Sequence, residues 1–314
     1  MLGMQRDLSP LQQIYSIKHE PKHLSEIVGH ENVVRRLQLM IEKRKVGNLL
    51  ISGVDGCGKL TLAKCFARDL YSGEYNSSVN VVHASDSLTS EERAAARREA
   101  YVSTSRIGSV SGQNIRMPQF IQVRIKPVVE LQALNSLGFK LIIVTDFDLL
   151  KQDQQGFRRL MEQYGRNCRF ILITQQISSI IDPIISRCQV LLMNPVSKAQ
   201  FYKELTRIGK IEGFRVKYTM INSLYYVAGG NIGKALNLIQ IFNLNKKELN
   251  EDNLFKILRE MERNFMLKFL EASLKNDFMN ARKIYYESKK QNSYEFQGFL
   301  EDLRKQTLKA PLRQ

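Results

Sequence analysis

Cysteine and histidine are both sparse in this sequence, and neither set has the spacing of a metal site. Four cysteines and four histidines are scattered along 314 residues, with no ligand cluster and no disulfide-framework pattern. This usage favours a reducing compartment. It argues against a structural metal and against a cysteine nucleophile, so no metal is expected.

Long apolar runs and acidic residues are also in short supply. No run approaches the roughly 20 apolar residues of a membrane span, and residues 1–10 lack a signal-peptide core, so no membrane partner is expected. The 31 Asp+Glu are outnumbered by 47 Lys+Arg, which gives a net charge of +16. Such an excess is typical of proteins with a polyanionic partner, most often nucleic acid, and a generally basic surface is the alternative. The length allows two or three domains.

Residues 49–61, LLISGVDGCGKLT, organise the rest of the chain. An apolar strand leads into a glycine-rich turn and then a helix, which is the context of a phosphate-binding loop. Glycines let successive N–H groups point at one anion, and the helix N-terminus adds a favourable dipole. The predicted nucleotide-binding residues here are Gly53, Val54, Asp55, Gly56, Cys57, Gly58, Lys59, Leu60 and Thr61.

The residues that normally hold magnesium beside such a loop are altered. Leu60 stands where a Ser or Thr hydroxyl is needed, and Thr61 comes one residue late, about 100° further round the helix. Residues 139–148, FKLIIVTDFD, predict a buried parallel strand, which in phosphate-loop enzymes ends in a metal-binding Asp. Thr145 stands there instead, followed by Asp146. The sequence therefore predicts a site for ATP or ADP with a damaged metal position.

Strands alternate with helices up to residue 194, which predicts an α/β fold with a parallel sheet. Further strands are predicted at 79–82, 120–125 and 169–174, and further helices at 33–45, 89–100, 128–137 and 153–164. Three short helices, at 199–213, 218–228 and 233–242, resemble a small lid, and longer helices follow at 254–274, 278–289 and 294–308. The predicted domains are 1–194, 195–248 and 249–314.

Several segments together resemble the AAA+ clamp-loader family, specifically the small subunits of replication factor C. They are EIVGH at 26–30, the phosphate loop, QGFRRLME at 155–162, RFIL at 169–172, the Ser186-Arg187-Cys188 signature after Ile-x-Pro-Ile, and GGN at 229–231 before ALN at 235–237. The resemblance covers residues 20–245 well and the C-terminal helices by position only. It implies a nucleotide-binding α/β domain, a three-helix lid and a helical collar that joins five subunits in a ring.

Among the small subunits, the chain is most similar to the one with a degenerate site, numbered five in yeast and three in humans. That subunit also lacks the Asp of the acidic strand and also has a long excursion between the phosphate loop and that strand. Three departures remain. Gln175 replaces the sensor Asn, Gly233 replaces the lid Arg, and the C-terminal region is short for a full collar.

The resemblance also implies particular roles and partners. Val28 would join the nucleotide-binding residues, and Arg187 would act in trans as an arginine finger on the neighbouring subunit's ATP. Gln155 and Arg159, four apart on one helical face, would couple the nucleotide site to the DNA-facing surface. The implied partners are the other subunits of a heteropentamer, the sliding clamp and primer-template DNA, in the nucleus.

Two other functions are open at this point. One is an active AAA+ ATPase motor, such as a helicase loader, that uses Thr61, Asp146 and Asp148 in shifted roles. The other is a scaffold subunit of the bacterial type of loader, but the zinc-binding cysteines common there are absent from this sequence.

Overall fold

The computed structural model describes residues 14–86, 88–92, 119–133, 135–245, 249–292 and 303–304. The chain divides into two compact units, Met1–Gln240 and Ile241–Gln314. The predicted helices at 89–100 and 294–308 lie mostly outside the described residues and remain predictions, as do the three predicted domains.

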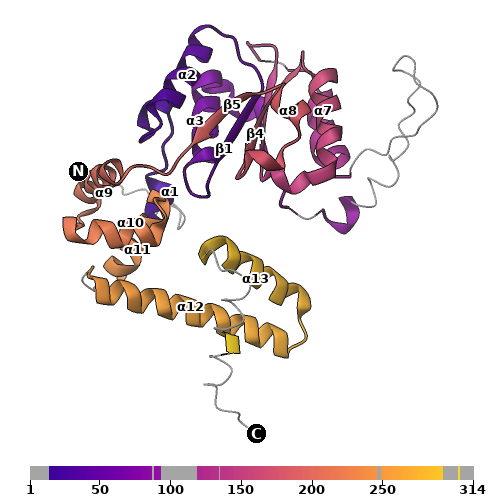
Figure 1. Cartoon of the computed structure of the whole chain (residues 1–314). Coiled ribbons are helices and arrows are strands. Elements are labelled where there is room, and N and C mark those ends of the chain that lie inside the picture. The colour runs from indigo at the N-terminus through magenta and orange to yellow at the C-terminus, as the bar shows by residue number, and fades with distance from the viewer. Residues whose placement is uncertain are drawn as a thin grey trace, which may run out of the picture. The chain divides into compact units, whose positions relative to one another are not determined.

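Five parallel strands form the centre of the first unit (Figure 1). They are β1 (Leu49–Gly53), β2 (Val79–His83), β3 (Lys140–Thr145), β4 (Cys168–Thr174) and β5 (Gln189–Met193), in the spatial order β2-β3-β4-β1-β5. Ile51 of β1 lies opposite Ile173 of β4 on one side and Leu191 of β5 on the other. Parallel strands place all their carboxyl ends at one edge, so the loop after β1 lies at that edge, between β4 and β5.

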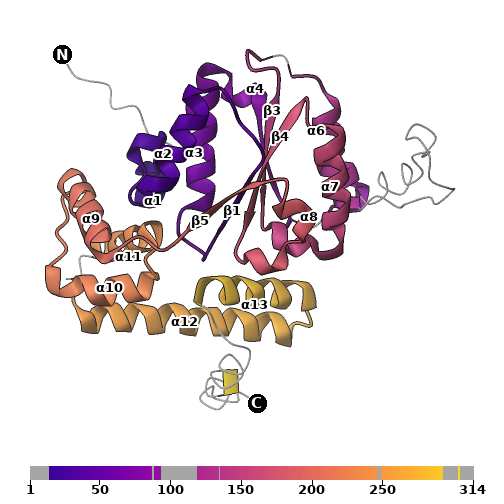
Figure 2. The same cartoon turned by 45° about the horizontal axis from the view of Figure 1, so that its top comes forward.

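Helices cover both faces of the sheet, as Figure 2 shows. One face carries α2 (Glu31–Glu42) and α3 (Lys59–Tyr71), and the other carries η5 (Ile121–Ile125), α6 (Lys126–Glu130), α7 (Gln154–Gln163) and α8 (Asp182–Ile185). On α3, Leu62, Cys65 and Phe66 are fully buried in a cluster with apolar residues of the sheet. Since both faces are covered, the strands are mostly apolar, and all six residues of β3 are buried.

Short helical segments join these elements. They are α1 (Tyr15–Lys18), η2 (Leu24–Glu26), η3 (Ser72–Glu74), α4 (Tyr75–Ser78), η6 (Phe147–Asp153), η7 (Ile177–Ser179) and η8 (Tyr218–Met220).

Five of the six helices predicted after the sheet are confirmed, and the one at 294–308 lies mostly outside the described residues. The first unit continues with α9 (Lys198–Glu212), α10 (Ile221–Ala228) and α11 (Ile232–Leu244), of which α11 runs past Gln240. Ser197 and Gln200 form a capping box at the start of α9. In the second unit, α12 (Glu251–Leu274) and α13 (Phe278–Asn292) pack against each other. Among the described residues, no helix combines the length and the apolar character that crossing a membrane requires.

The segment before β3 corrects two sequence predictions. The strand predicted at 120–125 is wrong, because this segment is helical. Ile121, Ile125 and Val129 are spaced four apart and are all fully buried, which is a helical face; the apparent alternation depended on Gln122, and that residue is buried too. The helix predicted at 128–137 ends at Glu130, where Leu131 turns to an extended conformation.

Strand β5 was not predicted from the sequence. It is only five residues long and lies at the edge of the sheet, so its burial is irregular and Leu192 is 63% exposed. Its apolar run, residues 190–193, is only four residues long, and periodicity alone cannot distinguish so short a run from a buried helical segment.

Three phenylalanine rings pack against one another on the face of the sheet that carries α7. Phe157 packs edge-to-face on Phe147 (5.0 Å between ring centroids) and on Phe170 (5.5 Å), and all three are fully buried. Phe157→Ala should lower the unfolding free energy of the first unit by about 3–5 kcal/mol, because it removes the central ring and leaves a cavity. Chemical denaturation followed by circular dichroism measures this change. The exposed Gln38→Ala is the control, and an equal loss in both variants would contradict the central place of Phe157.

Candidate nucleotide site

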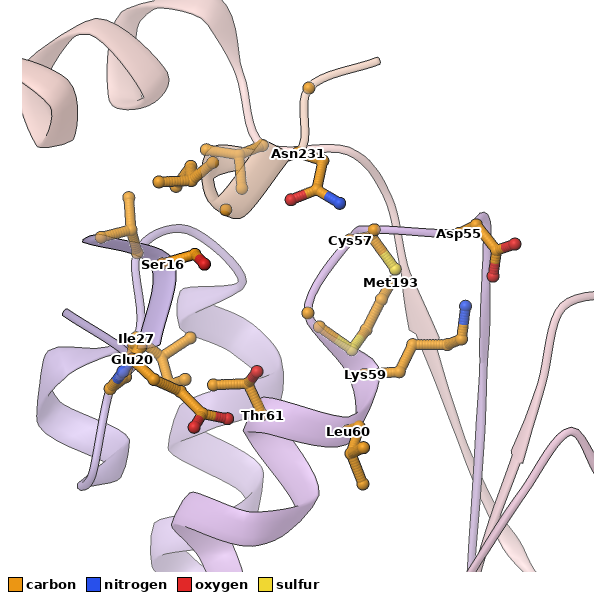
Figure 3. Close-up of a pocket in the computed structure, with 18 of the residues that line it drawn as sticks. Ser16, Glu20, Ile27, Asp55, Cys57, Lys59, Leu60, Thr61, Met193 and Asn231 are labelled. Atoms are coloured by element: carbon orange, nitrogen blue, oxygen red, sulfur yellow. The ribbon is translucent and has the colours of Figure 1, made fainter. Parts of the chain in front are cut away.

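A cavity of about 440 Å³ opens at the carboxyl edge of the sheet (Figure 3). It is lined by the loop after β1, the first turn of α3, the segment before α2, the ends of β2 and β3, and the lid helices α9 and α11. The volume is within the usual range for small-molecule sites. Of the ten predicted nucleotide-binding residues, eight line it: Val28 and the run from Asp55 to Thr61.

The loop after β1 closes around the ammonium group of Lys59. Its Nζ donates to Gly53 O at 2.5 Å and to Val54 O at 2.8 Å, and Lys59 is only 8% exposed. Gly56 and Gly58 have φ of +79° and +89°, which favours glycine. A Cβ at Gly53 would lie 2.2 Å from the carbonyl oxygen of Met193. This backbone has the form that cradles phosphate, so the residues present fit a nucleotide.

The lid contacts the tip of this loop. Figure 3 shows Asn231 lying over the loop beside Cys57. A Cβ at Gly56 would be 2.4 Å from Asn231 Nδ2, so only glycine allows this close approach. Asn231 Oδ1 also accepts from the backbone N–H of Lys234, which caps the start of α11. Gly233, where the family resemblance expects an arginine, lines the cavity and brings no side chain to it.

The segment before α2 holds the lid at two places. The backbone N–H of Tyr15 donates to Gln240 Oε1 at 2.9 Å, and the Tyr15 ring stacks on Phe214 with centroids 6.0 Å apart. His19 Nε2 and Lys18 Nζ lie 2.6 and 2.7 Å from Glu212 Oε1. His19 also lines the cavity, so this segment connects the nucleotide site to the lid. Sequence reasoning missed it, because residues about 200 positions apart carry no local pattern.

The position of the metal-binding Asp is occupied by a hydroxyl that is already bonded. Thr145 is buried, and its Oγ1 forms a 2.7 Å hydrogen bond with His83 Nδ1. Asp146 has a left-handed backbone (φ 52°), and its Oδ2 accepts from Ser85 Oγ at 2.8 Å. Asp148 Oδ1 accepts from Thr174 Oγ1 at 3.1 Å.

The loop side of the same site offers little to a metal ion. Figure 3 shows Leu60 and Thr61 pointing to different sides of the first turn of α3. Among the described residues, no three His, Cys, Asp or Glu side chains gather in a metal-binding arrangement. Magnesium prefers octahedral oxygen ligands with carboxylates among them. The side chains at Leu60 and Thr145 therefore do not fit a magnesium ion of the usual phosphate-loop type.

Two further groups reach the loop from neighbouring elements. Gln175, at the sensor position after β4, donates from Nε2 to Asp55 Oδ2 at 2.9 Å. Burial lowers the pKa of His30 despite a hydrogen bond with the Cys57 backbone that raises it, so the ring favours its neutral form. Burial likewise raises the pKa of the Cys57 thiol and keeps it protonated. Cys57 is thus a packing residue of the loop and not a reactive one.

Arg187 lies on the surface, away from the cavity. Its Nη2 donates to Glu162 Oε1 at 2.6 Å and its Nη1 to Pro183 O at 2.7 Å, and the side chain is 36% exposed. Gln155 and Arg159 are also exposed, on α7. The predicted finger residue and the two predicted coupling residues are therefore all exposed at the surface of the first unit.

Burial raises the pKa of Cys188, next to Arg187, to about 12, so this thiol stays neutral.

Glu212 makes the lid attachment sensitive to acid. Burial alone would raise the pKa of this carboxyl, but hydrogen bonds from Lys18 and His19 bring it below its ordinary value. A lowered folded-state pKa gives stability that is present above the unfolded value of about 4.3 and is lost as the pH falls through the folded value. At pH 7, Glu212→Gln should destabilise the first unit by about 1–3 kcal/mol.

Thermal unfolding of wild type and Glu212→Gln between pH 7 and pH 3 measures this effect. The gap in melting temperature should close below about pH 4. The exposed Glu42→Gln on α2 is the control, with no gap at either pH. A gap for Glu212→Gln that persists in acid would contradict the assignment.

Comparison with known proteins places the chain in a family. The family model described as DNA polymerase III, delta subunit, matches residues 29–197, more than half of the chain. The replication factor C small subunit of Methanococcus vannielii is 28% identical over 88% of this chain and 79% of its own length. The replication factor C small subunit 1 of Pyrobaculum aerophilum is 30% identical over 84% of this chain and 72% of its own.

The fold has its own relatives among solved structures. The RuvB Holliday junction branch migration motor of Thermotoga maritima superposes with a TM-score of 0.53 at 15% identity, over 90% of each chain. This likeness concerns the fold alone, and it agrees with the predicted AAA+ phosphate-loop architecture. By the family model and the sequence relatives together, the chain belongs to the family of replication factor C small subunits.

Proposed function

We propose that this chain is a weakly hydrolysing or non-hydrolysing small subunit of a replication factor C clamp loader. Such a loader places a sliding clamp on primer-template DNA in an ATP-dependent way. The relatives that carry the name replication factor C small subunit support this role over most of the chain. The proposed partners are the other subunits of a heteropentameric ring, the clamp and DNA, and the proposed location is the nucleus.

The main evidence for weak or absent hydrolysis is Thr145 at the carboxyl end of β3. Its hydroxyl is bonded to His83, and no carboxylate stands at that position. Leu60 follows the loop Lys, and Gly233 faces the cavity without a side chain. Little is then left to stabilise charge on a transferring phosphoryl group. From this pattern we propose that the chain corresponds to the degenerate-site subunit, numbered five in yeast and three in humans.

The loop nevertheless has what it needs to hold ATP or ADP. Backbone N–H groups of residues 55–59 and the ammonium of Lys59 would bind the phosphates, and Val28 lines the same cavity. The nucleotide supplies the negative charge that this cradle is built to receive. Since the lid residue Asn231 contacts Gly56 directly, a bound nucleotide would act as a structural part that sets the lid against the loop.

The positive contribution of the chain to ATP hydrolysis is proposed to be Arg187, acting in trans. The guanidinium lies at the surface, outside the chain's own cavity, and is 36% exposed, so the γ-phosphate of a neighbouring subunit could reach it. An arginine finger stabilises charge that develops in the transition state and is worth about 10³–10⁵ in rate. Gln155 and Arg159, exposed on α7, are proposed to couple that event to DNA in the ring.

An active motor is the second candidate function. Thr61 and Asp146 both line the cavity, which favours it. Against it, the Asp146 carboxylate is bonded to Ser85 and that of Asp148 to Thr174. Each carboxylate thus has one oxygen engaged by a neighbouring hydroxyl.

Arg187→Ala tests the proposed finger in the assembled ring. The chain should fold normally, because Arg187 is exposed. Hydrolysis at the site of the one neighbouring subunit should fall on the order of 10³-fold or more. The total ATP turnover of the ring should then drop by the contribution of that site. Steady-state phosphate release with clamp and primed DNA measures this loss. The exposed Arg166→Ala is the matched control, and unchanged turnover in Arg187→Ala would remove the finger role.

The isolated chain tests whether its own site works. Turnover of ATP should stay at background, because the metal ligands are missing. A fluorescent ATP analogue should bind, and chelating magnesium should change its affinity by less than about threefold. Lys59→Ala should weaken that binding by removing the ammonium from the loop. Turnover above background that Lys59→Ala abolishes would favour the motor instead.

A further inference from the structure

Residues at both ends of helix α7 contact the segment 179–187, which carries Arg187. At its start, the side chain of Gln154 is fully buried. Gln154 Nε2 donates to Ser179 O and Gln154 Oε1 accepts from the backbone N–H of Ile181, both at 3.0 Å. A buried amide that satisfies two backbone groups fixes the path of the chain, so the approach to α8 is set by α7.

At the other end of α7, Glu162 holds the guanidinium itself. Arg187 Nη2 lies 2.6 Å from Glu162 Oε1, while Nη1 donates to Pro183 O. Glu162 is 46% exposed and Arg187 36% exposed. Exposed ion pairs contribute little to folding stability, so this contact has more value for the direction of the side chain than for the fold.

We infer that Glu162 is a positioning residue for Arg187. With one edge of the guanidinium held by Glu162 and Pro183, its remaining N–H groups are fixed in direction before the neighbouring subunit arrives. Arginine recognises phosphate through a planar fork, so a fixed orientation saves rotamer entropy in the transition state. This inference rests on the proposed function, because it needs Arg187 to act on a neighbour's ATP.

The same contact gives α7 a second connection. Arg159 lies three residues before Glu162, on the same stretch of helix, and both are exposed. A displacement of Arg159 or Gln155 would therefore be transmitted to the guanidinium through helix α7 and the ion pair between Glu162 and Arg187. The helix thereby joins the proposed coupling residues to the proposed finger without passing through the chain's own cavity.

The experiment compares Glu162→Ala, Glu162→Gln and Arg187→Ala in rings assembled with the full-length chain. Glu162→Ala should slow hydrolysis at the one neighbouring site by about three- to tenfold, so the ring loses most of that site's share of kcat. KM should stay within about twofold, because the direction of the guanidinium matters in the transition state and not for binding ATP. Glu162→Gln keeps an acceptor oxygen for Nη2 and should restore most of kcat. Gln163→Ala, exposed at the next position, should behave as wild type.

A double variant separates positioning from a general structural effect. In the Arg187→Ala background, Glu162→Ala should cause no further loss, because its effect passes through Arg187. Full kcat in Glu162→Ala beside a slow Arg187→Ala ring would overturn the inference and leave the proposed function standing. Faster turnover in both Glu162 variants would also overturn it and assign Glu162 as a competitor for the guanidinium. If Arg187→Ala has no effect, the proposed function and this inference both fail.

Discussion

The parallel pairing of five strands is the constraint on which the site depends. It brings the ends of β1, β2, β3 and β4 to one edge, so the phosphate loop, His83, Thr145 and Gln175 meet although the chain separates them widely. The two buried faces require apolar strands, and the polar residues of the site can therefore begin only where each strand ends. This geometry explains why single residues at strand ends decide what the cavity can do.

Binding and catalysis have different requirements, and the chain meets them unequally. Phosphate binding relies on backbone N–H groups and one lysine, which survive almost any change in the neighbouring strands. Hydrolysis needs a carboxylate and a hydroxyl at two defined places. Here Thr145 stands in place of the carboxylate and Leu60 in place of the hydroxyl. A cation at the surface is independent of both. This independence is what the proposed function requires, since it assigns the cavity to nucleotide binding and Arg187 to a neighbouring subunit.

The sequence predicted the parts of the fold that have local patterns. The phosphate loop, the buried strands β3 and β4 and the three lid helices all followed from glycine spacing, continuous apolar runs or helical periodicity. Residues 120–125 were predicted wrongly, because the buried Gln122 imitated strand alternation in a helix. The hydrogen bond between His83 and Thr145 and the contact of Asn231 with Gly56 could not be predicted, since both depend on tertiary placement.

The attachment of the N-terminal segment to the lid has a consequence for how the protein is made. Tyr15 meets its partner Gln240 across 225 residues, and His19 meets Glu212 across 193. The ribosome synthesises the chain from its N-terminus. Tyr15 and His19 therefore cannot form these contacts until nearly the whole first unit has emerged. Contacts of such long range close slowly, because loop entropy must be overcome first. We therefore expect the wall of the cavity that contains His19 to be among the last parts of the first unit to form during synthesis.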